Sequence, residues 1–385
     1  MSLAFDRQEF DARLARVREQ MADQNLDVVL VFGQDQMFYL TGYDQIGYSY
    51  YQVLVVSRDD PRVVYLCREV DAHIIRETSV AEDIRVWYDD HRNDPTEFTA
   101  AIVREFVDIT GCRIGMELQT HGLLPVFYAR LAVHLAAASI VDASALLTDL
   151  RLEKSPAEVA CMREAGTLFD IGMRAGIAAM HEGTRECDVH GAVMQSIYAA
   201  GGEFPAVAPP LESGPRTLHQ THGAALRREL KAHDPVNLEI GACFRRYHAV
   251  GVRSAAIGAP VAVQQRLHGI LREALQAGLE VAGPGVATAD VAEAMHGVYL
   301  VNGIDRRTRH CGYGIGIGYP PTWIDNLRIK LTDTHILKPG MTFMLHGILA
   351  DWDAELAVAL GDPVLITDTG VDRLTTLGHD LVVCD

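Results

Sequence analysis

One acidic residue stands inside an apolar stretch that has the pattern of a buried strand. Glu239 lies in the middle of VNLEIGA, residues 236–242. Burial raises the pKa of a carboxyl group unless a cation pairs with it, and a raised pKa suits a general base or a nucleophile. The structural alternative is an ion pair between Glu239 and Arg253 or Arg246. On its residue type and surroundings, Glu239 is the first candidate for a catalytic role.

Two histidines precede this stretch, and either one could transfer a proton. His222 lies 17 residues before Glu239, and His219 belongs to the same segment. An imidazole has a pKa near neutrality, so it can protonate a leaving nitrogen atom at physiological pH. The alternative for both is an exposed histidine on a surface loop. We expect His222 to act and keep His219 as the second choice.

Other polar and aromatic residues could hold a small charged ligand. The run RRYH, residues 245–248, and Arg253 lie in a strand-like pattern. Successive side chains of a strand alternate between its faces, so about half of these would reach a cleft. The rings of Tyr43, Tyr48 and Trp323 could bind a cationic or zwitterionic ligand through their faces. Ordinary interface aromatics are the alternative.

The glycine-rich run GYGIGIGYPP, residues 312–321, does not indicate a nucleotide site. A phosphate-binding glycine loop opens a helix, and the two prolines that end this run exclude a helix there. Alternating glycines instead allow two strands to approach closely. Tyr313 within the run either points into a cleft or is a buried, satisfied tyrosine.

The elements that position these residues fall into two parts. Residues 1–150 alternate between strand and helix patterns, which predicts a small α/β domain. Ser155-Pro156-Ala157-Glu158 is a capping box with proline at the first helical position, so a helix begins there. We therefore place a second domain at residues 151–385. The strand-like runs of the first domain are residues 27–33, 53–57 and 63–67, and its helical stretches are 97–107 and 125–138.

The second domain contains an internal repeat. The segment that starts at Gly183 corresponds to the one that starts at Gly285, at a constant offset of 102 residues. A long helix precedes each copy, at about residues 156–181 and 262–282, and strand-like sequence follows each. Two helices followed by antiparallel strands, repeated once, predict a pseudo-two-fold α+β domain with its site between the halves.

Composition excludes several classes of protein. The chain has 385 residues and a net charge of −17, which argues against nucleic acid or an anionic membrane as the partner. It has no apolar run as long as a membrane span, and its amino terminus lacks the apolar stretch of a signal peptide. The seven cysteines are scattered, which indicates reduced thiols. We expect a cytoplasmic protein.

The motifs together resemble the pita-bread superfamily, which includes methionine aminopeptidase, prolidase and creatinase. The resemblance rests on EKSPAEV (153–159), the 102-residue repeat, GYGIGIGYPP (312–321) and PGMTF (339–343). It implies a creatinase-type amino-terminal domain at 1–150 and a pita-bread catalytic domain at 151–385. It also implies a homodimer in which the first domain of one subunit lies near the site of the other.

The peptidases of this superfamily bind two metal ions through two aspartates, one histidine and two glutamates. In this sequence, the matching positions hold Glu239, Val250, Tyr313, His346 and Gly361. A dinuclear site needs bridging carboxylates, and a valine and a glycine offer no donor atom. The pattern resembles the metal-free branch of the superfamily, which includes the ectoine hydrolases and creatinase. The run LEIGACFRRYH (238–248) is most similar to the ectoine hydrolases, and creatinase is the next most similar. No cofactor is expected.

The resemblance implies a metal-independent hydrolase of a C–N bond in a small amidine, guanidine or amide derivative of an amino acid. Glu239 would deliver the nucleophile, His222 would protonate the leaving nitrogen, and Tyr313 with Arg253 would hold the substrate. The expected substrate-binding residues are Arg253, Tyr247, His248, His346, Tyr43, Tyr48 and Trp323. Two alternatives stay open: an Xaa-Pro dipeptidase-type metallopeptidase and a non-catalytic binding protein.

Overall fold

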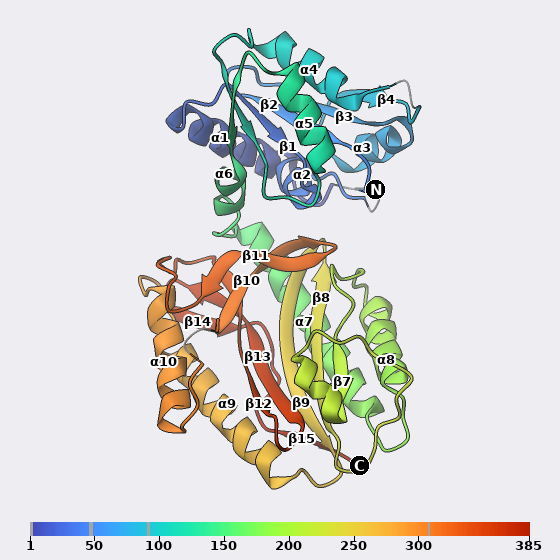
Figure 1. Cartoon of the computed structure of the whole chain (residues 1–385), viewed down its shortest axis with the longest axis vertical. Helices are drawn as coiled ribbons and strands as arrows, with labels where there is room; N and C mark the ends of the chain where they lie inside the picture. Colours follow the sequence, from blue (N-terminus) through green and yellow to red (C-terminus); the bar gives the residue numbers. More distant parts are fainter. Residues whose placement is uncertain (1–2, 46–48, 91–92, 307–308) are drawn as a thin grey trace. The chain divides into compact units, whose positions relative to one another are not determined.

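The computed structural model describes residues 3–45, 49–90, 93–306 and 309–385. The chain divides into two compact units, residues 1–151 and 152–385, and each is described by itself (Figure 1). Within the described ranges, no helix is both long and apolar enough to cross a membrane. All seven cysteines are free thiols, and six of them are buried.

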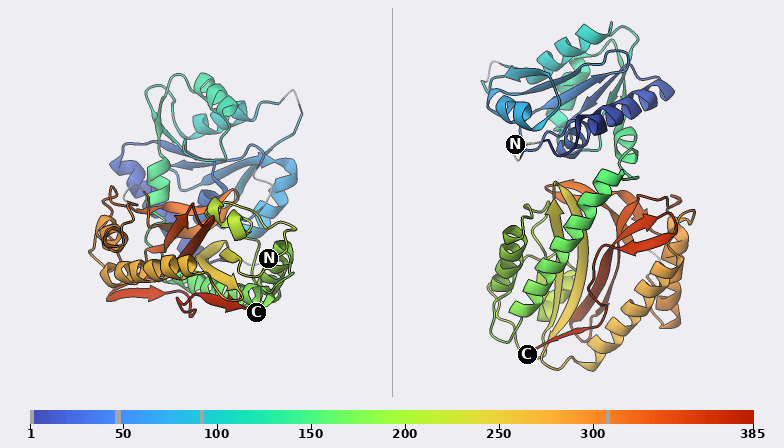
Figure 2. Two further views of the ribbon diagram at one scale, coloured as in Figure 1. Left: turned by 60° about the horizontal axis from the view of Figure 1, so that its bottom comes forward. Right: turned by 180° about the vertical axis from the view of Figure 1, so that it is seen from behind.

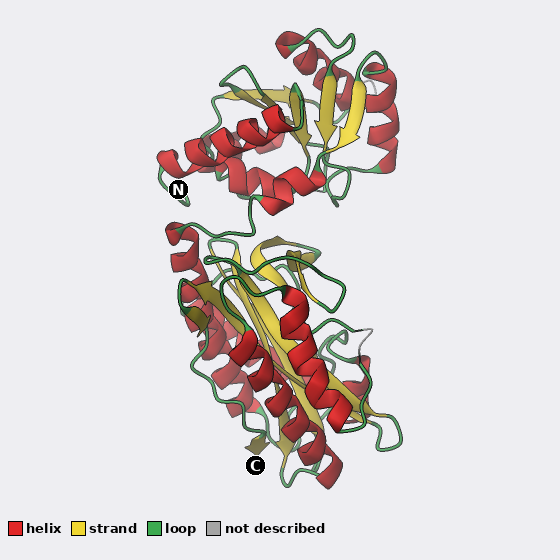
Figure 3. Cartoon of the chain, turned by 90° about the vertical axis from the view of Figure 1, so that its left-hand side faces the viewer, coloured by secondary structure: helices red, strands yellow, loops and turns green. Residues whose placement is uncertain are grey.

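The first unit is a mixed six-stranded sheet flanked by helices (Figure 3). The strand order is β4-β3-β2-β1-β5-β6, and β1 runs antiparallel to β2 and parallel to β5. Its strands are β1 (Val28–Val31), β2 (Val53–Ser57), β3 (Val63–Arg68), β4 (Asp83–Trp87), β5 (Arg113–Met116) and β6 (Ser139–Asp142). Its helices are α1 (Arg7–Asp23), α2 (Gln34–Thr41), α3 (Ala72–Thr78), α4 (Pro95–Phe106), α5 (Pro125–His134) and α6 (Ser144–Asp149).

The second unit repeats one motif, two helices followed by a long antiparallel hairpin, as the 102-residue offset predicts. Each half has its own apolar core between its helices and its strands. The first copy consists of α7 (Pro156–Ala179), α8 (Glu186–Ala199), β8 (Pro235–Phe244) and β9 (Tyr247–Ile257). The second consists of α9 (Ala262–Val281), α10 (Thr288–Val301), β12 (Thr342–Asp351) and β13 (Leu356–Thr367). The capping box at Ser155 and Glu158 begins α7 as predicted.

Equivalent glycines close equivalent turns in the two halves. Gly183 and Gly285 both have φ of 86°, a left-handed conformation that favours glycine. The amide of Gly183 donates to the carbonyl of Leu230 at 2.9 Å, and that of Gly285 donates to Leu337 at 2.8 Å. The sequence repeat therefore reflects a repeated backbone conformation with repeated hydrogen bonds.

The strands of both halves form a single sheet of nine strands in the second unit, in the order β11-β10-β12-β13-β9-β8-β7, with β14 and β15 beside it. Helices α7 and α9 pack on one face of this sheet (Figure 2). The remaining strands are β7 (Leu211–Ser213), β10 (Gly312–Tyr319), β11 (Thr322–Ile329), β14 (Gly370–Arg373) and β15 (Val382–Cys384). The opposite face of the sheet is left for a site.

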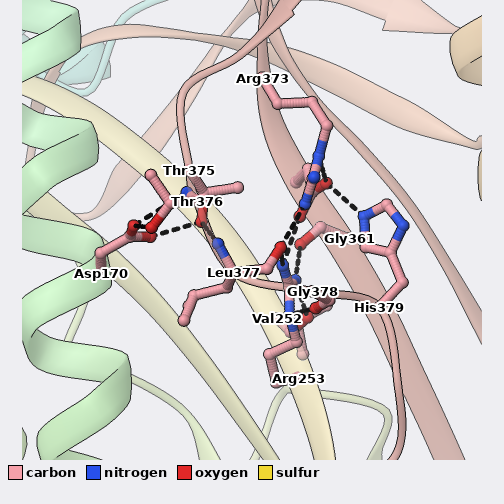
Figure 4. Close-up of polar contacts among 11 residues, drawn as sticks. Asp170, Val252, Arg253, Gly361, Arg373, Thr375, Thr376, Leu377, Gly378 and His379 are labelled. Carbon is pink, nitrogen blue, oxygen red and sulfur yellow. Dashed lines mark hydrogen bonds and ion pairs between the residues drawn. The ribbon is translucent and has the colours of Figure 1, made fainter.

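A buried ionic cluster ties the carboxyl-terminal segment to the sheet (Figure 4). The fully buried carboxylate of Asp362 accepts from Arg253 Nη2 at 2.6 Å, from Arg373 Nε at 2.5 Å and from His379 Nε2 at 2.6 Å. Burial alone would raise the pKa of Asp362, but the His379 hydrogen bond and the two guanidinium charges hold it well below its ordinary value. Asp362 is therefore ionised, and its charge is matched within the fold.

Replacing Asp362 with Asn should destabilise the protein by about 3–5 kcal/mol, because two guanidinium groups would lose their counter-ion inside the protein. Urea unfolding at pH 7 measures this change. A carboxyl group with a depressed native pKa stabilises the fold above its unfolded pKa, so the difference from wild type should narrow as the pH falls below about 4.

The matched control for this substitution is Asp372→Asn. Asp372 pairs with Arg163 at 2.7 Å on the surface, where both side chains are about half exposed. Its loss should lower the free energy of unfolding by less than about 1 kcal/mol. Equal losses in the free energy of unfolding for the two substitutions would show that burial does not increase the contribution of Asp362 to stability.

Candidate active site

The register of four neighbouring strands places the candidate residues in one row across the sheet. Glu239 of β8 lies opposite Val252 of β9, Val252 lies opposite Gly361 of β13, and Gly361 lies opposite His346 of β12. Directly paired residues point to the same face of a sheet. Tyr313 of β10 pairs with Met344, two residues from His346, and so shares that face. Residues far apart in sequence are thereby brought together.

These side chains line a cavity of about 320 Å³ in the second unit. This volume is in the range of sites for small molecules. From the sheet come Glu239, Tyr313, His346 and Trp323, and the loop after the 3₁₀ helix at 214–219 contributes Gln220, Thr221 and His222. The segment after α10 contributes Arg306, Arg309 and His310.

Glu239 is buried in the wall of the cavity with two neutral hydrogen-bond donors. Tyr313 donates its hydroxyl to Glu239 Oε1 at 3.0 Å, and the side chain of Thr221 forms a second bond. Burial raises the pKa of the Glu239 carboxyl, while these two bonds and the nearby His222 act in the opposite direction. A carboxylate whose proton affinity is raised and whose donors are neutral is a stronger base and nucleophile than an exposed one.

Tyr313 is itself held in place by Trp323. The indole Nε1 donates to the Tyr313 hydroxyl at 3.3 Å, and the pKa of Tyr313 lies well above its ordinary value because of burial and the Glu239 charge. The phenol therefore stays protonated and acts as a donor to Glu239. Gly241 leaves room for the indole, because a Cβ atom there would lie 2.4 Å from the Trp323 ring.

The histidines of the cavity differ in their surroundings. Burial, together with the charge of His310, lowers the pKa of His346 to about 3, so its ring is neutral at pH 7. Among the described residues, its Nε2 atom has no hydrogen-bond partner. His222 is exposed to solvent and lines the cavity, whereas His219 is not among the lining residues. Of the two loop histidines, only His222 is placed to face a bound substrate.

Three predicted substrate-binding residues do not line the cavity. Arg253 follows Val252 and therefore points to the opposite face of the sheet, where it binds Asp362. The hydroxyl of Tyr247 donates to Glu158 Oε1 of α7 at 2.8 Å, also on the helix side.

His248 is on the cavity face but is committed to the backbone. Its Nε2 accepts from the Ala206 amide at 2.9 Å, and its Nδ1 bonds the Arg246 carbonyl at 3.0 Å. The expected roles of Arg253, Tyr247 and His248 in substrate binding are thus corrected to structural ones.

Two tyrosines of the first unit, Tyr43 and Tyr48, were expected to contact the substrate. Tyr43 is fully buried in the core of its own unit, with its ring 5.3 Å from that of Tyr65 in an edge-to-face arrangement. This burial removes it from any ligand surface, which corrects the expected contact with substrate. Tyr48 lies outside the described residues.

The residues present do not fit the two-metal site of the peptidases. Of the five ligand positions, Val250 and Gly361 carry no donor atom, and Tyr313 carries a phenol whose pKa is raised rather than lowered. In the ranges that the structure describes, no group of three or more His, Cys, Asp or Glu side chains is arranged to hold a metal ion.

The cavity also contains residues that the sequence did not single out, among them Thr221, Arg306, Arg309 and His310. Thr221 is adjacent to His222 and could have been found only from its contact with Glu239. Arg306, Arg309 and His310 form a basic cluster just before the glycine-rich run. Such a cluster is unusual in a chain of net charge −17. This contrast could have identified the three residues from the sequence.

Comparison with known proteins places the chain in a family. Residues 160–368 match the metallopeptidase family M24, and residues 13–152 match the creatinase/prolidase N-terminal domain. The chain belongs to family M24. This confirms the predicted fold, a creatinase-type amino-terminal domain with a pita-bread domain, and makes the protein a hydrolase of this family.

The relatives of this M24 protein have different activities. It is 31% identical to an ectoine hydrolase from Halomonas elongata, over all of this chain and 99% of that protein. An Xaa-Pro dipeptidase from Pyrococcus furiosus is 28% identical, over 62% of this chain and 67% of that protein. Among solved structures, the prolidase from Thermococcus sibiricus superposes with a TM-score of 0.88 at 19% identity, covering 97% of this chain and 99% of that one.

Replacing Tyr313 with Phe should raise the pKa of Glu239 further, because the lost hydrogen bond stabilises the ionised form. Carbon NMR of labelled glutamate side chains would measure this pKa, with the Glu239 signal assigned by its absence from Glu239→Gln. Tyr319→Phe on the same strand is the control and should leave the signal unmoved. A lower pKa in Tyr313→Phe would contradict the assigned donor.

Proposed function

We propose that this M24 protein hydrolyses a non-peptide C–N bond in a small amidine, guanidine or amide derivative of an amino acid, without a metal ion. The observation that carries the proposal is Glu239, a buried carboxylate held by neutral donors where the peptidases have their first metal ligand. The full-length similarity to an ectoine hydrolase supports the same class of reaction.

The arrangement supports two routes to the same products. The Glu239 carboxylate either attacks the electrophilic carbon directly or removes a proton from a water molecule that attacks it. The carbon–nitrogen bond then breaks, and His222 gives a proton to the leaving nitrogen. Tyr313 holds the carboxylate in position throughout. After direct attack, a water molecule hydrolyses the bond that Glu239 has formed with the carbon and so frees the carboxylate. In both routes one water molecule is consumed: its oxygen ends on the carbon and its two hydrogens are taken up by the products.

The charges of the cavity favour a substrate that carries both a cation and a carboxylate. Glu239 and the ring face of Trp323 would attract an amidinium or guanidinium group. Arg306 and Arg309, from the segment after α10, also line the cavity and would attract a carboxylate. The neutral His346 offers its Nε2 for one hydrogen bond to the substrate. Ectoine, a cyclic amidine with a carboxylate, is our leading candidate.

An Xaa-Pro dipeptidase activity is the second candidate function. It is favoured by the dipeptidase relative and by the prolidase fold. The side chains at the five ligand positions oppose it. A pita-bread protein that binds a metabolite or peptide without turnover is the third possibility, and the buried, uncompensated carboxylate argues for chemistry instead.

We also propose a cytoplasmic location and a homodimer. Seven free thiols fit a reducing compartment. The dimer, with the first domain of one subunit near the site of its partner, follows from the resemblance to creatinase-like enzymes. Sedimentation analysis of the full chain tests the dimer.

Replacing Glu239 with Gln should abolish turnover, because the amide is neither a base nor a nucleophile, while the cavity keeps its shape. Hydrolysis of ectoine followed by proton NMR measures the loss, and calorimetric titration shows whether the variant still binds. Retained turnover in Glu239→Gln would overturn the assignment.

Replacing His222 with Ala should lower kcat by about a hundredfold or more, as expected for removal of a general acid. His219→Ala is the matched control, since His219 belongs to the same loop but does not line the cavity. Its kcat should stay within about threefold of wild type. A larger loss of kcat in His219→Ala than in His222→Ala would assign proton donation to His219 instead.

A further inference from the structure

The loop that brings Thr221 and His222 to the cavity has an unfavourable backbone conformation. Gln220 has φ of 57° and Thr221 has φ of 66°, so two consecutive residues other than glycine are left-handed. Residues with side chains rarely adopt this region, and a β-branched threonine is among the least suited to it. Surrounding contacts must therefore hold the loop in place.

Two of those contacts come from one buried carboxylate. Glu212 lies in β7 and is completely shielded from solvent. Its Oε2 accepts from the Thr221 amide at 3.0 Å, and its Oε1 accepts from the Gly223 amide at 2.5 Å. The two oxygens thus bind the amides on either side of His222. We call this pair of hydrogen bonds the Glu212 clamp. A Cβ atom at Gly223 would lie 2.8 Å from Oε1, so a larger residue there would disturb the clamp.

Glu212 is also next to the catalytic carboxylate in the sheet. It lies opposite Asn237 of β8, two residues before Glu239, and so shares the cavity face. The Glu212 charge is one of the influences that raise the pKa of Glu239. Burial raises the pKa of Glu212 itself, while its hydrogen bonds to the Thr221 and Gly223 amides act in the opposite direction.

We propose that Glu212 is a positioning residue for the reaction: its carboxylate fixes the 219–223 loop so that His222 faces the substrate and Thr221 bonds Glu239. The proposal rests on the proposed function for the roles of His222 and Glu239. The clamp itself is a property of the fold, so it can be tested separately from activity.

The chain contains a matched control for this clamp. Glu203 accepts from the amides of Arg245 and Arg246, each at 3.0 Å. These two residues are also consecutive and left-handed, with φ of 47° and 65°. They form the turn between β8 and β9 and do not line the cavity. Glu203 thus performs the same backbone chemistry at a place where no catalytic group depends on it.

The first test is amide hydrogen exchange of the full-length protein, which needs no substrate. In Glu212→Gln, one acceptor oxygen becomes a donor facing a backbone amide, so exchange within residues 219–223 should accelerate at least tenfold. Glu203→Gln should leave this segment unchanged and loosen residues 244–247 instead. Unchanged exchange of the 219–223 segment in Glu212→Gln would overturn the proposal. Gly223→Ala should give the same loosening if Glu212→Gln folds poorly.

The second test is a double-mutant cycle with the substrate. Glu212→Gln should lower kcat at least tenfold with KM within about threefold of wild type, because misplacing a catalytic group affects the transition state most. In the His222→Ala background the same change should cost markedly less than in the wild type, since of the two groups that it positions only Thr221 remains. Glu203→Gln should change kcat in neither background.

The outcomes separate the two proposals. Full additivity in the cycle would show that Glu212 acts independently of His222 and would overturn the positioning role. A wild-type protein that hydrolyses no substrate, together with a 219–223 loop that loosens in Glu212→Gln, would contradict the proposed function and leave the clamp established.

Discussion

The alternation of side chains along β9 and β13 is the constraint on which the rest of the second unit depends. Val252 and Arg253 are consecutive, as are Gly361 and Asp362, so each pair contributes one residue to each face of the sheet. On the helix face, Asp362 is compensated by two arginines and a histidine. On the other face, the row beside Glu239 holds the uncharged residues Val252 and Gly361, and Gly361 is packed against His346. One register thus places a charge-compensated carboxylate and the candidate catalytic carboxylate on opposite faces of the sheet.

The opposite pKa directions of these two carboxyl groups follow from their partners. Both are buried, and burial raises the pKa of each. Asp362 has cations to offset that effect, whereas Glu239 has only a phenol and a hydroxyl group as direct donors. The fold therefore matches the charge of Asp362 with cations and leaves Glu239 with neutral donors, as the proposed catalytic role requires. The residues beside Glu239 in the same row, Val252 and Gly361, carry no charge that could offset it.

Much of the fold could be predicted because its signals are local. The capping box at Ser155 and the repeated glycines predicted the two halves of the second unit. The helix expected at about 156–181 is observed at Pro156–Ala179. The strand expected at 53–57 is observed as Val53–Ser57. Hydrophobic periodicity and capping depend on neighbours in sequence, so they can be read without the tertiary structure.

The face of Arg253 could not be predicted, because it depends on the register of the β8–β9 hairpin. That register is set by a two-residue turn at Arg245 and Arg246. Such turns usually carry Asn-Gly or Asp-Gly, which marks their position in a sequence. Here Glu203 stabilises the turn from a distant part of the chain, so no local signal existed. The Glu212 clamp could not be predicted either, because no local sequence pattern marks the hydrogen bonds between Glu212 and the loop.

The most direct test of the central claim is proton NMR of EDTA-treated protein of measured metal content, incubated with ectoine, creatine and an Xaa-Pro dipeptide in one sample. A metal-independent hydrolase built around Glu239 should consume ectoine or creatine and leave the dipeptide intact. Cleavage of the dipeptide on addition of Mn²⁺, with ectoine and creatine unchanged, would contradict the account.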